Sequence, residues 1–168
     1  PNAVSYVLGL AKAYTTRVGA GPFPTEQDNE IGQRLGKKGH EFGTVTGRAR
    51  RCGWFDGVAI RYATWLNGFT TLSVTKLDVL DHFEEIKVCT AYRIDGVETI
   101  EFPDTPDLER AVPVYETWPG WQRSTRDART WKDLPKNARA FLHRIAELSG
   151  APIRYVSVGP ARAELVVV

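Results

Sequence analysis

Hydrophobic and polar positions follow a helical spacing in two segments of the first half of the chain. Apolar side chains over 57–67 form a broad face, Asp56 precedes them as a suitable N-cap, and Asn67-Gly68 follows, which together predict a helix. Apolar residues over 4–11 are spaced as in a short helix leading into 14–18.

The most complete helix pattern lies near the end of the chain, over 134–148. Asp133 is its predicted cap, Pro135 occupies its first turn and Gly150 follows its end. Its core stripe is expected to consist of Leu134, Ala138, Phe141, Leu142, Ile145 and Leu148.

Other segments have the apolar runs or two-residue alternation of strands. Asp95-Gly96 separates two alternating segments and predicts a tight turn between antiparallel strands. Strands are predicted over 70–76, 86–92, 97–102, 153–158 and 164–168.

The remaining segments lack a clear period. Residues 19–26 are dense in Gly and Pro and predict an ordered loop or turn. Residues 26–43 leave two alternatives, a short helix near 28–37 or a mobile lid, and residues 103–132 are expected to wrap the surface. Helices alternating with strands predict a single α/β domain over 1–168, with a mixed sheet, flanking helices and an antiparallel hairpin.

Composition narrows the class of protein. The 168 residues, 42% of them hydrophobic, suffice for one globular domain with a core. A net charge of +2 argues against a general nucleic-acid coat, and no apolar run approaches the length of a membrane span. Two cysteines and no secretion signal favour a reducing, cytoplasmic setting. Because the chain starts at Pro1 and contains no Met, we expect a fragment.

One basic loop combines hydroxyl groups, glycine and arginine. Its residues are Thr44, Val45, Thr46, Gly47, Arg48, Ala49, Arg50 and Arg51. Planar guanidinium groups bind carboxylates and phosphates through paired hydrogen bonds, so this loop is a candidate anion site. The alternative is a solvated basic loop.

Two further candidates lie at predicted strand ends. In Thr75-Lys76-Leu77-Asp78, the Asp carboxylate could accept hydrogen bonds from N1–H and the amine of guanine, while the lysine ammonium ties down neighbouring loops. Ser157-Val158-Gly159-Pro160 could approach a flat base edge closely because glycine has no side chain. Surface charges and a plain turn are the alternatives. In open α/β sheets, ligands bind beyond the carboxyl ends of strands, so the two segments are expected to meet at one pocket.

Other motifs carry little chemistry. Gly32–Lys38 is one residue short of a phosphate-binding G-x-x-x-x-G-K-[ST] loop and lacks its hydroxyl. The Gly-rich segment 14–26 could press backbone against a ligand ring or be a structural crossover. The three histidines have no metal-ligand spacing. Cys52 follows three arginines, which could lower its thiol pKa, but a structural cysteine is the preferred interpretation.

Four motifs in order resemble the C-terminal portion of the adenylosuccinate synthetase family. They are Y-T-T-R-V-G-A-G-P-F-P-T-E (14–26), G-T-V-T-G-R-A-R-R-C-G-W-F-D (43–56), T-K-L-D-V-L-D (75–81) and S-V-G-P-A-R (157–162). The resemblance implies part of a larger GTP-binding α/β ligase that joins IMP and L-aspartate, using GTP and Mg²⁺, in AMP biosynthesis. It also implies a cytoplasmic homodimer.

The resemblance assigns a role to each motif. Residues Thr44 to Arg50 would bind aspartate, with Arg48 also near IMP and Arg50 near GTP. Val18 and Gly19 would place backbone near the IMP ring. The guanine-binding residues would be Lys76, Leu77, Asp78, Ser157, Val158, Gly159 and Pro160.

The family's catalytic Asp and His, its phosphate loop and its Mg²⁺ ligands would belong to a missing N-terminal half. We therefore expect no catalytic residue and no metal ligand in this chain, and no activity from it alone. Two alternatives stay open: a guanine-nucleotide-binding or regulatory module without catalysis, and a basic RNA-binding domain built around Arg48–Arg51.

Overall fold

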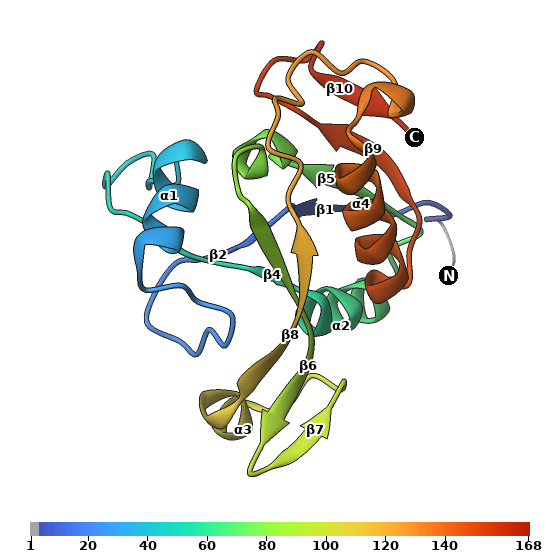
Figure 1. Ribbon diagram of the computed structural model, residues 1–168. Helices are drawn as coiled ribbons and strands as arrows, with labels where there is room; N and C mark the ends of the chain where they lie inside the picture. Colours follow the sequence, from blue (N-terminus) through green and yellow to red (C-terminus); the bar gives the residue numbers. More distant parts are fainter. Residues whose placement is uncertain (1–3) are drawn as a thin grey trace.

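The main sheet of the computed structural model, which describes residues 4–168, has the strand order β1-β5-β9-β10 (Figure 1). The first three strands are parallel, and β10 runs antiparallel to β9. The carboxyl ends of β1, β5 and β9 therefore lie along one edge of the sheet. The strands are β1 (Leu8–Lys12), β5 (Thr71–Thr75), β9 (Ile153–Ser157) and β10 (Leu165–Val167).

The helix predicted over 4–11 is wrong, because β1 occupies its second half. This strand pairs residue by residue with β5, from Leu8 with Thr71 to Lys12 with Thr75. Gly9 is buried, and a Cβ atom there would lie 2.5 Å from the Phe69 ring, so the strand needs glycine at this contact. The apolar spacing was too short to separate a helix from a strand.

A second sheet is organised around the long strand β6. It pairs with β4 in parallel and with β7 and β8 in antiparallel fashion. The predicted hairpin is confirmed, since Asp95 (φ 49°) and Gly96 (φ 86°) both adopt the left-handed conformation that a two-residue hairpin turn requires. Its strands are β4 (Phe55–Asp56), β6 (Glu85–Ile94), β7 (Val97–Thr99) and β8 (Val112–Pro119).

The prediction that residues 103–132 only wrap the surface is wrong. They include α3 (Thr105–Arg110) and β8, which pairs along most of β6. Pro113 and Pro119 concealed this strand, because proline cannot donate a ladder hydrogen bond and is confined to strand edges. Strand β8 pairs only with β6 in the described chain, so it forms such an edge.

The helix predicted over 57–67 is confirmed as α2 (Gly57–Asn67). The Asp56 carboxylate accepts a hydrogen bond from the Ala59 amide at 3.0 Å, and Gly68 ends the helix with φ 62°. Between the two alternatives for 26–43, the structure has a helix, α1 (Glu30–Lys38), capped by Asn29.

Helix α4 (Lys136–Ser149) confirms the third predicted helix, and its whole predicted stripe is buried. The predicted cap is wrong. Asp133 belongs to a preceding 3₁₀ turn, η2 (Trp131–Asp133), and accepts hydrogen bonds from the Arg129 and Thr130 amides. The cap position is held by Pro135, whose fixed φ suits a helix start.

Helix α4 packs with α2 against the sheets. The lower arm in Figure 1 consists of the second half of β6 together with β7, β8 and α3. The larger core cluster joins α4 to side chains of β5, β9, β10 and the near half of β6. Two short strands, β2 (Thr15–Arg17) and β3 (Arg51–Gly53), pair separately beside α1. No helix within residues 4–168 is long and apolar enough to cross a membrane.

Candidate functional site

The arginine loop projects from the body of the protein between α1 and β3. Backbone hydrogen bonds close it, from the Gly43 amide to the Arg48 carbonyl and from the Gly47 amide to the Gly43 carbonyl, both at 2.8 Å. Gly47 has φ 64°, which favours glycine at the tip. Residues 44–49 are all exposed, so the Thr44, Val45 and Thr46 side chains and the Arg48 guanidinium are available to a ligand.

Two of the segments selected from the sequence meet in one small cavity. Val18 and Gly19, which follow β2, line a cavity of about 90 Å³ together with Thr46, Arg48, Ala49 and Arg50 of the loop. The structure therefore brings backbone from the Gly-rich segment to the face of the arginine loop.

The three arginines of the loop have different surroundings. Arg51 forms a paired ion contact with Glu26, at 2.7 Å and 2.5 Å, and donates to the Gly19 and Gly21 carbonyls. These contacts hold the 19–26 turn in place, so Arg51 is structural. Arg48 is exposed and Arg50 donates to Glu41 through Nη1, so these two keep guanidinium N–H groups available to a ligand.

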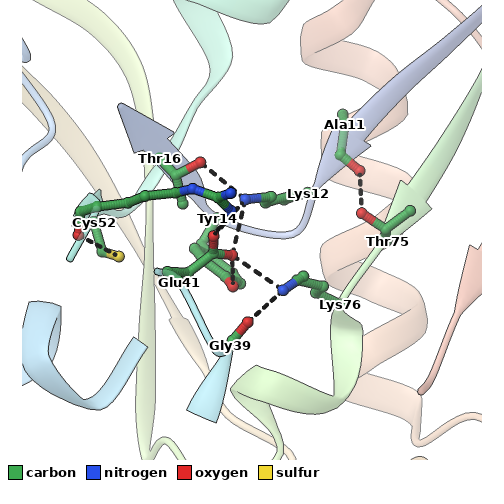
Figure 2. A network of polar contacts seen from close by, with 10 residues as sticks. Ala11, Lys12, Tyr14, Thr16, Gly39, Glu41, Cys52, Thr75 and Lys76 are labelled. Carbon is green, nitrogen blue, oxygen red and sulfur yellow. Dashed lines mark hydrogen bonds and ion pairs between the residues drawn. The ribbon is translucent and has the colours of Figure 1, made fainter. Parts of the chain in front are cut away.

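Arg50 donates to Glu41, the buried centre of a polar network. Figure 2 shows Lys12, Tyr14 and Lys76 gathered around Glu41. The Glu41 side chain is fully buried, and its carboxylate accepts from Lys12 at 2.8 Å through both oxygens, from Arg50 at 2.8 Å and from the Tyr14 hydroxyl at 2.5 Å. Lys76 completes the set, with its ammonium 3.2 Å from a Glu41 oxygen.

The network fixes the charge of its members. Burial opposes ionisation of Glu41, but hydrogen bonds from Lys12, Tyr14 and Arg50 outweigh it and lower the pKa of Glu41 to about 2. Burial and the hydrogen bond to Glu41 raise the pKa of Tyr14, which stays protonated. One carboxylate thus faces three cations, and the cluster keeps an excess of positive charge.

Lys76 links this network to the end of β5. It has φ 61°, turns the chain out of the strand into a 3₁₀ turn, η1 (Leu77–Leu80), and donates to the Gly39 carbonyl as well as contacting Glu41. Its ammonium ties the loop after α1 to the strand end, as the sequence predicted. The Leu77 side chain is fully buried, so only its backbone can face a ligand.

The other predicted segment lies beside this one. Strands β5 and β9 pair in parallel, with Val74 opposite Val156, so Ser157-Val158-Gly159-Pro160 follows the neighbouring strand end. The Val158 side chain is fully buried, and a Cβ atom on Gly159 would lie 2.3 Å from the Glu164 carboxylate, so a side chain there would displace that carboxylate. The two strand ends are neighbours, as predicted, while their meeting in one pocket stays a prediction.

Asp78 lies at the start of η1 and is half-buried. Burial, followed by the nearby charge of Asp81, raises its pKa above the ordinary value for an aspartate. Asp81 itself is buried and accepts from the Trp121 indole and from the Thr125 amide and hydroxyl, each at 2.8 Å. These contacts anchor the 121–125 segment beside the strand end.

Sequence reasoning missed Glu41, Lys12 and Tyr14. A single acidic residue just before the arginine loop was the only local sign, and two of its cationic partners, Lys12 and Lys76, lie at strand ends that are distant in the sequence. Cys52 has the structural role that the sequence favoured, since burial raises the pKa of its thiol to about 11. No group of three or more His, Cys, Asp or Glu residues in the described part of the chain could hold a metal ion.

Comparison with known proteins identifies the family. The adenylosuccinate synthetase family model matches residues 1–166. The chain is 53% identical to adenylosuccinate synthetase of Magnetococcus marinus over 100% of its own length, and 54% identical to that of Schizosaccharomyces japonicus over 99%. It covers 39% of each of these relatives, so it spans about two fifths of their length.

A solved structure, described as fully ligated adenylosuccinate synthetase from Plasmodium falciparum, resembles the chain with a TM-score of 0.90 and 37% identity. The match covers 98% of this chain and 40% of that one. The mixed α/β fold is thus that of part of a larger α/β enzyme. The chain belongs to the adenylosuccinate synthetase family.

Proposed function

We propose that this chain is the C-terminal, substrate-binding portion of an adenylosuccinate synthetase, the GTP-dependent ligase that joins IMP and L-aspartate in AMP biosynthesis. The observation that carries the proposal is the cavity in which Val18-Gly19 faces Arg48 and Arg50. Two cationic guanidinium groups beside open backbone suit a dicarboxylate next to a purine ring.

Within this site, residues 44–50 bind aspartate. Arg48 and Arg50 face its carboxylates, Arg48 also reaches IMP and Arg50 reaches GTP. Val18 and Gly19 contact the IMP ring through backbone. Arg51 has no such role, because all three of its guanidinium nitrogens donate to Glu26 or to the Gly19 and Gly21 carbonyl groups.

The adjacent ends of β5 and β9 form the guanine site. Asp78 reads the base through N1–H and the exocyclic amine, a pairing that adenine cannot offer. Leu77, Val158, Gly159 and Pro160 contribute backbone, because the first two have buried side chains. Ser157 and Lys76 lie beside the base, one at each strand end.

The catalytic Asp and His, the phosphate loop and the Mg²⁺ ligands lie in the other portion of the enzyme. The chain alone is therefore catalytically inactive, and the complete enzyme works in the cytoplasm as a homodimer. Mg²⁺ there supplies charge for phosphoryl transfer from GTP to IMP.

The test compares the 168-residue chain with a complete synthetase, in which the missing portion of the Magnetococcus marinus relative precedes this chain. The complete enzyme should form adenylosuccinate from IMP, aspartate and GTP, and the isolated chain should not. Product formation by the isolated chain would overturn the proposal that the catalytic residues lie in the other portion of the enzyme.

Arg48→Ala in the complete synthetase tests the loop. It should raise KM for aspartate about tenfold or more, because a charge-assisted pair to a carboxylate is lost. Arg93→Ala is the matched control, since the Arg93 side chain lies in an exposed ion pair with Glu98 on the arm. An unchanged KM for aspartate in Arg48→Ala would refute the assignment. A tight, micromolar Kd for GTP with the isolated chain would instead favour a nucleotide-binding module without catalysis.

A further inference from the structure

Glu41 contacts residues of both candidate sites. Its carboxylate holds Arg50 of the arginine loop through one oxygen and Lys76 of the β5 end through the other. Lys12, the last residue of β1, contacts both oxygens. Three segments that are far apart in the sequence thus converge on a single buried side chain (Figure 2).

We infer that Glu41 is a positioning residue shared by the aspartate site and the guanine site, an inference that rests on the proposed function. It sets the Arg50 guanidinium and the Lys76 ammonium at a fixed separation. Loss of its charge therefore weakens binding of two substrates at once, although Glu41 itself, being fully buried, touches neither.

The geometry leaves the carboxylate little freedom. Oε1 accepts from Tyr14 at 2.5 Å and Lys12 at 2.8 Å, and it lies 3.2 Å from Lys76. Oε2 accepts from Lys12 and Arg50, both at 2.8 Å. With four partners making five contacts to the two oxygens, the carboxylate cannot turn away without breaking several of these contacts and leaving the buried Tyr14 hydroxyl unpaired.

The backbone of Glu41 reinforces the same link. Its carbonyl accepts from the Arg50 amide at 2.9 Å, and its own amide donates to the Gly36 carbonyl of α1 at 2.9 Å. Arg50 is therefore fixed at both ends by one residue. Only one guanidinium nitrogen, Nη1, is used for Glu41, so the remaining N–H groups stay available for an anionic ligand.

The charge balance separates this cluster from an ordinary structural ion pair. Three cations surround one carboxylate, and each cation keeps part of its side chain exposed, at 25% for Lys12, 30% for Arg50 and 34% for Lys76. The excess positive charge is directed to solvent, where a dicarboxylate or a phosphate group would neutralise it.

The decisive experiment is Glu41→Gln in the complete synthetase, a change that preserves volume and removes the charge. KM for aspartate and KM for GTP should both rise about tenfold, while KM for IMP changes by less than about threefold. A purely structural role would lower Tm and leave the KM values unchanged, and that outcome would overturn the inference. Glu98→Gln, in the exposed pair with Arg93, is the matched control and should change neither Tm nor KM.

A double-substitution cycle keeps the inference testable if Glu41→Gln does not fold. Arg50→Ala and Lys76→Ala share Glu41 as partner, so their effects on KM for GTP should be non-additive. Arg48→Ala lies outside the Glu41 contacts and should combine additively with Lys76→Ala. Additive behaviour of both pairs would overturn the shared role.

Failure of the proposed function would give a different pattern of KM values. If the sites themselves are assigned wrongly, Lys76→Ala leaves KM for GTP unchanged and Arg50→Ala leaves KM for aspartate unchanged. If only the inference fails, these single changes raise their KM values and Glu41→Gln does not.

Discussion

The buried charge of Glu41 gives this protein a specific dependence of stability on pH. The pKa of Glu41 is about 2, against 4.5 for an unperturbed carboxyl group. At about 1.4 kcal/mol per pKa unit, this difference corresponds to roughly 3.5 kcal/mol of stabilisation at neutral pH. Water screens the partly exposed Lys12, Arg50 and Lys76, so we expect about 2 kcal/mol.

The sign follows from the direction of the change in pKa. A carboxyl group whose pKa is lower in the folded state contributes fully above its unfolded pKa, and the contribution is lost as pH falls through the folded value. For Glu41 the loss begins near pH 4.5 and continues to about pH 2. Glu41→Gln imitates the protonated state and should remove the contribution at every pH.

The assay is urea unfolding of the 168-residue chain followed by Trp fluorescence, repeated from about pH 7 downward for as long as both proteins stay folded. The wild type should exceed Glu41→Gln by about 2 kcal/mol at neutral pH, and the difference should shrink as the pH falls below about 4.5. Other acidic groups titrate equally in both proteins and cancel. A difference that stays constant with pH, or that is below about 0.5 kcal/mol at neutral pH, would refute this account of the network.

Three further changes test other features. Asp78→Asn in the complete synthetase should lower kcat/KM for GTP about thirtyfold. It should also relax the choice of base, measured by comparing GTP with ITP. Unchanged GTP kinetics would rule out Asp78 as the guanine-reading residue. Cys52, whose thiol pKa is raised to about 11, should react with a thiol reagent at neutral pH only after unfolding; rapid labelling of the native protein would contradict its burial. Gly150→Ala should lower the free energy of unfolding by about 1 kcal/mol in urea, because φ is 72° there although space is open, and an unchanged midpoint would count against that strain.

Local signals predicted the elements whose ends are marked in the sequence. Helix α2 lies between Asp56 and Gly68, and the hairpin turns at Asp95-Gly96, so each was found with nearly correct bounds. Strands β1 and β8, which lack such signals, were missed. The short β1 has no marker that excludes a helix, and β8 contains prolines that are acceptable only because β6 pairs with one edge of it.

The residues of the candidate site likewise include some that the sequence could predict and some that it could not. The arginine loop and the segment at Val18 are continuous motifs, and the structure brings them together in one cavity. Glu41 could not be found in this way, because its importance comes from Lys12 and Lys76 at the ends of two different strands. Nor could the sequence separate Arg51 from its neighbours, since its partner Glu26 is 25 residues away in the chain.

The parallel order of β1, β5 and β9 has a consequence for how the protein is made. Each of these strands pairs with one that is far along the chain, Lys12 with Thr75 and Val74 with Val156, so the main sheet closes long loops and forms slowly. The capped helices and the hairpin can form earlier from local contacts. During synthesis, β5 remains an unpaired edge on one side until residues 153–157 emerge. A chain that ends before β9 would expose that edge, and we expect such a truncated chain to aggregate.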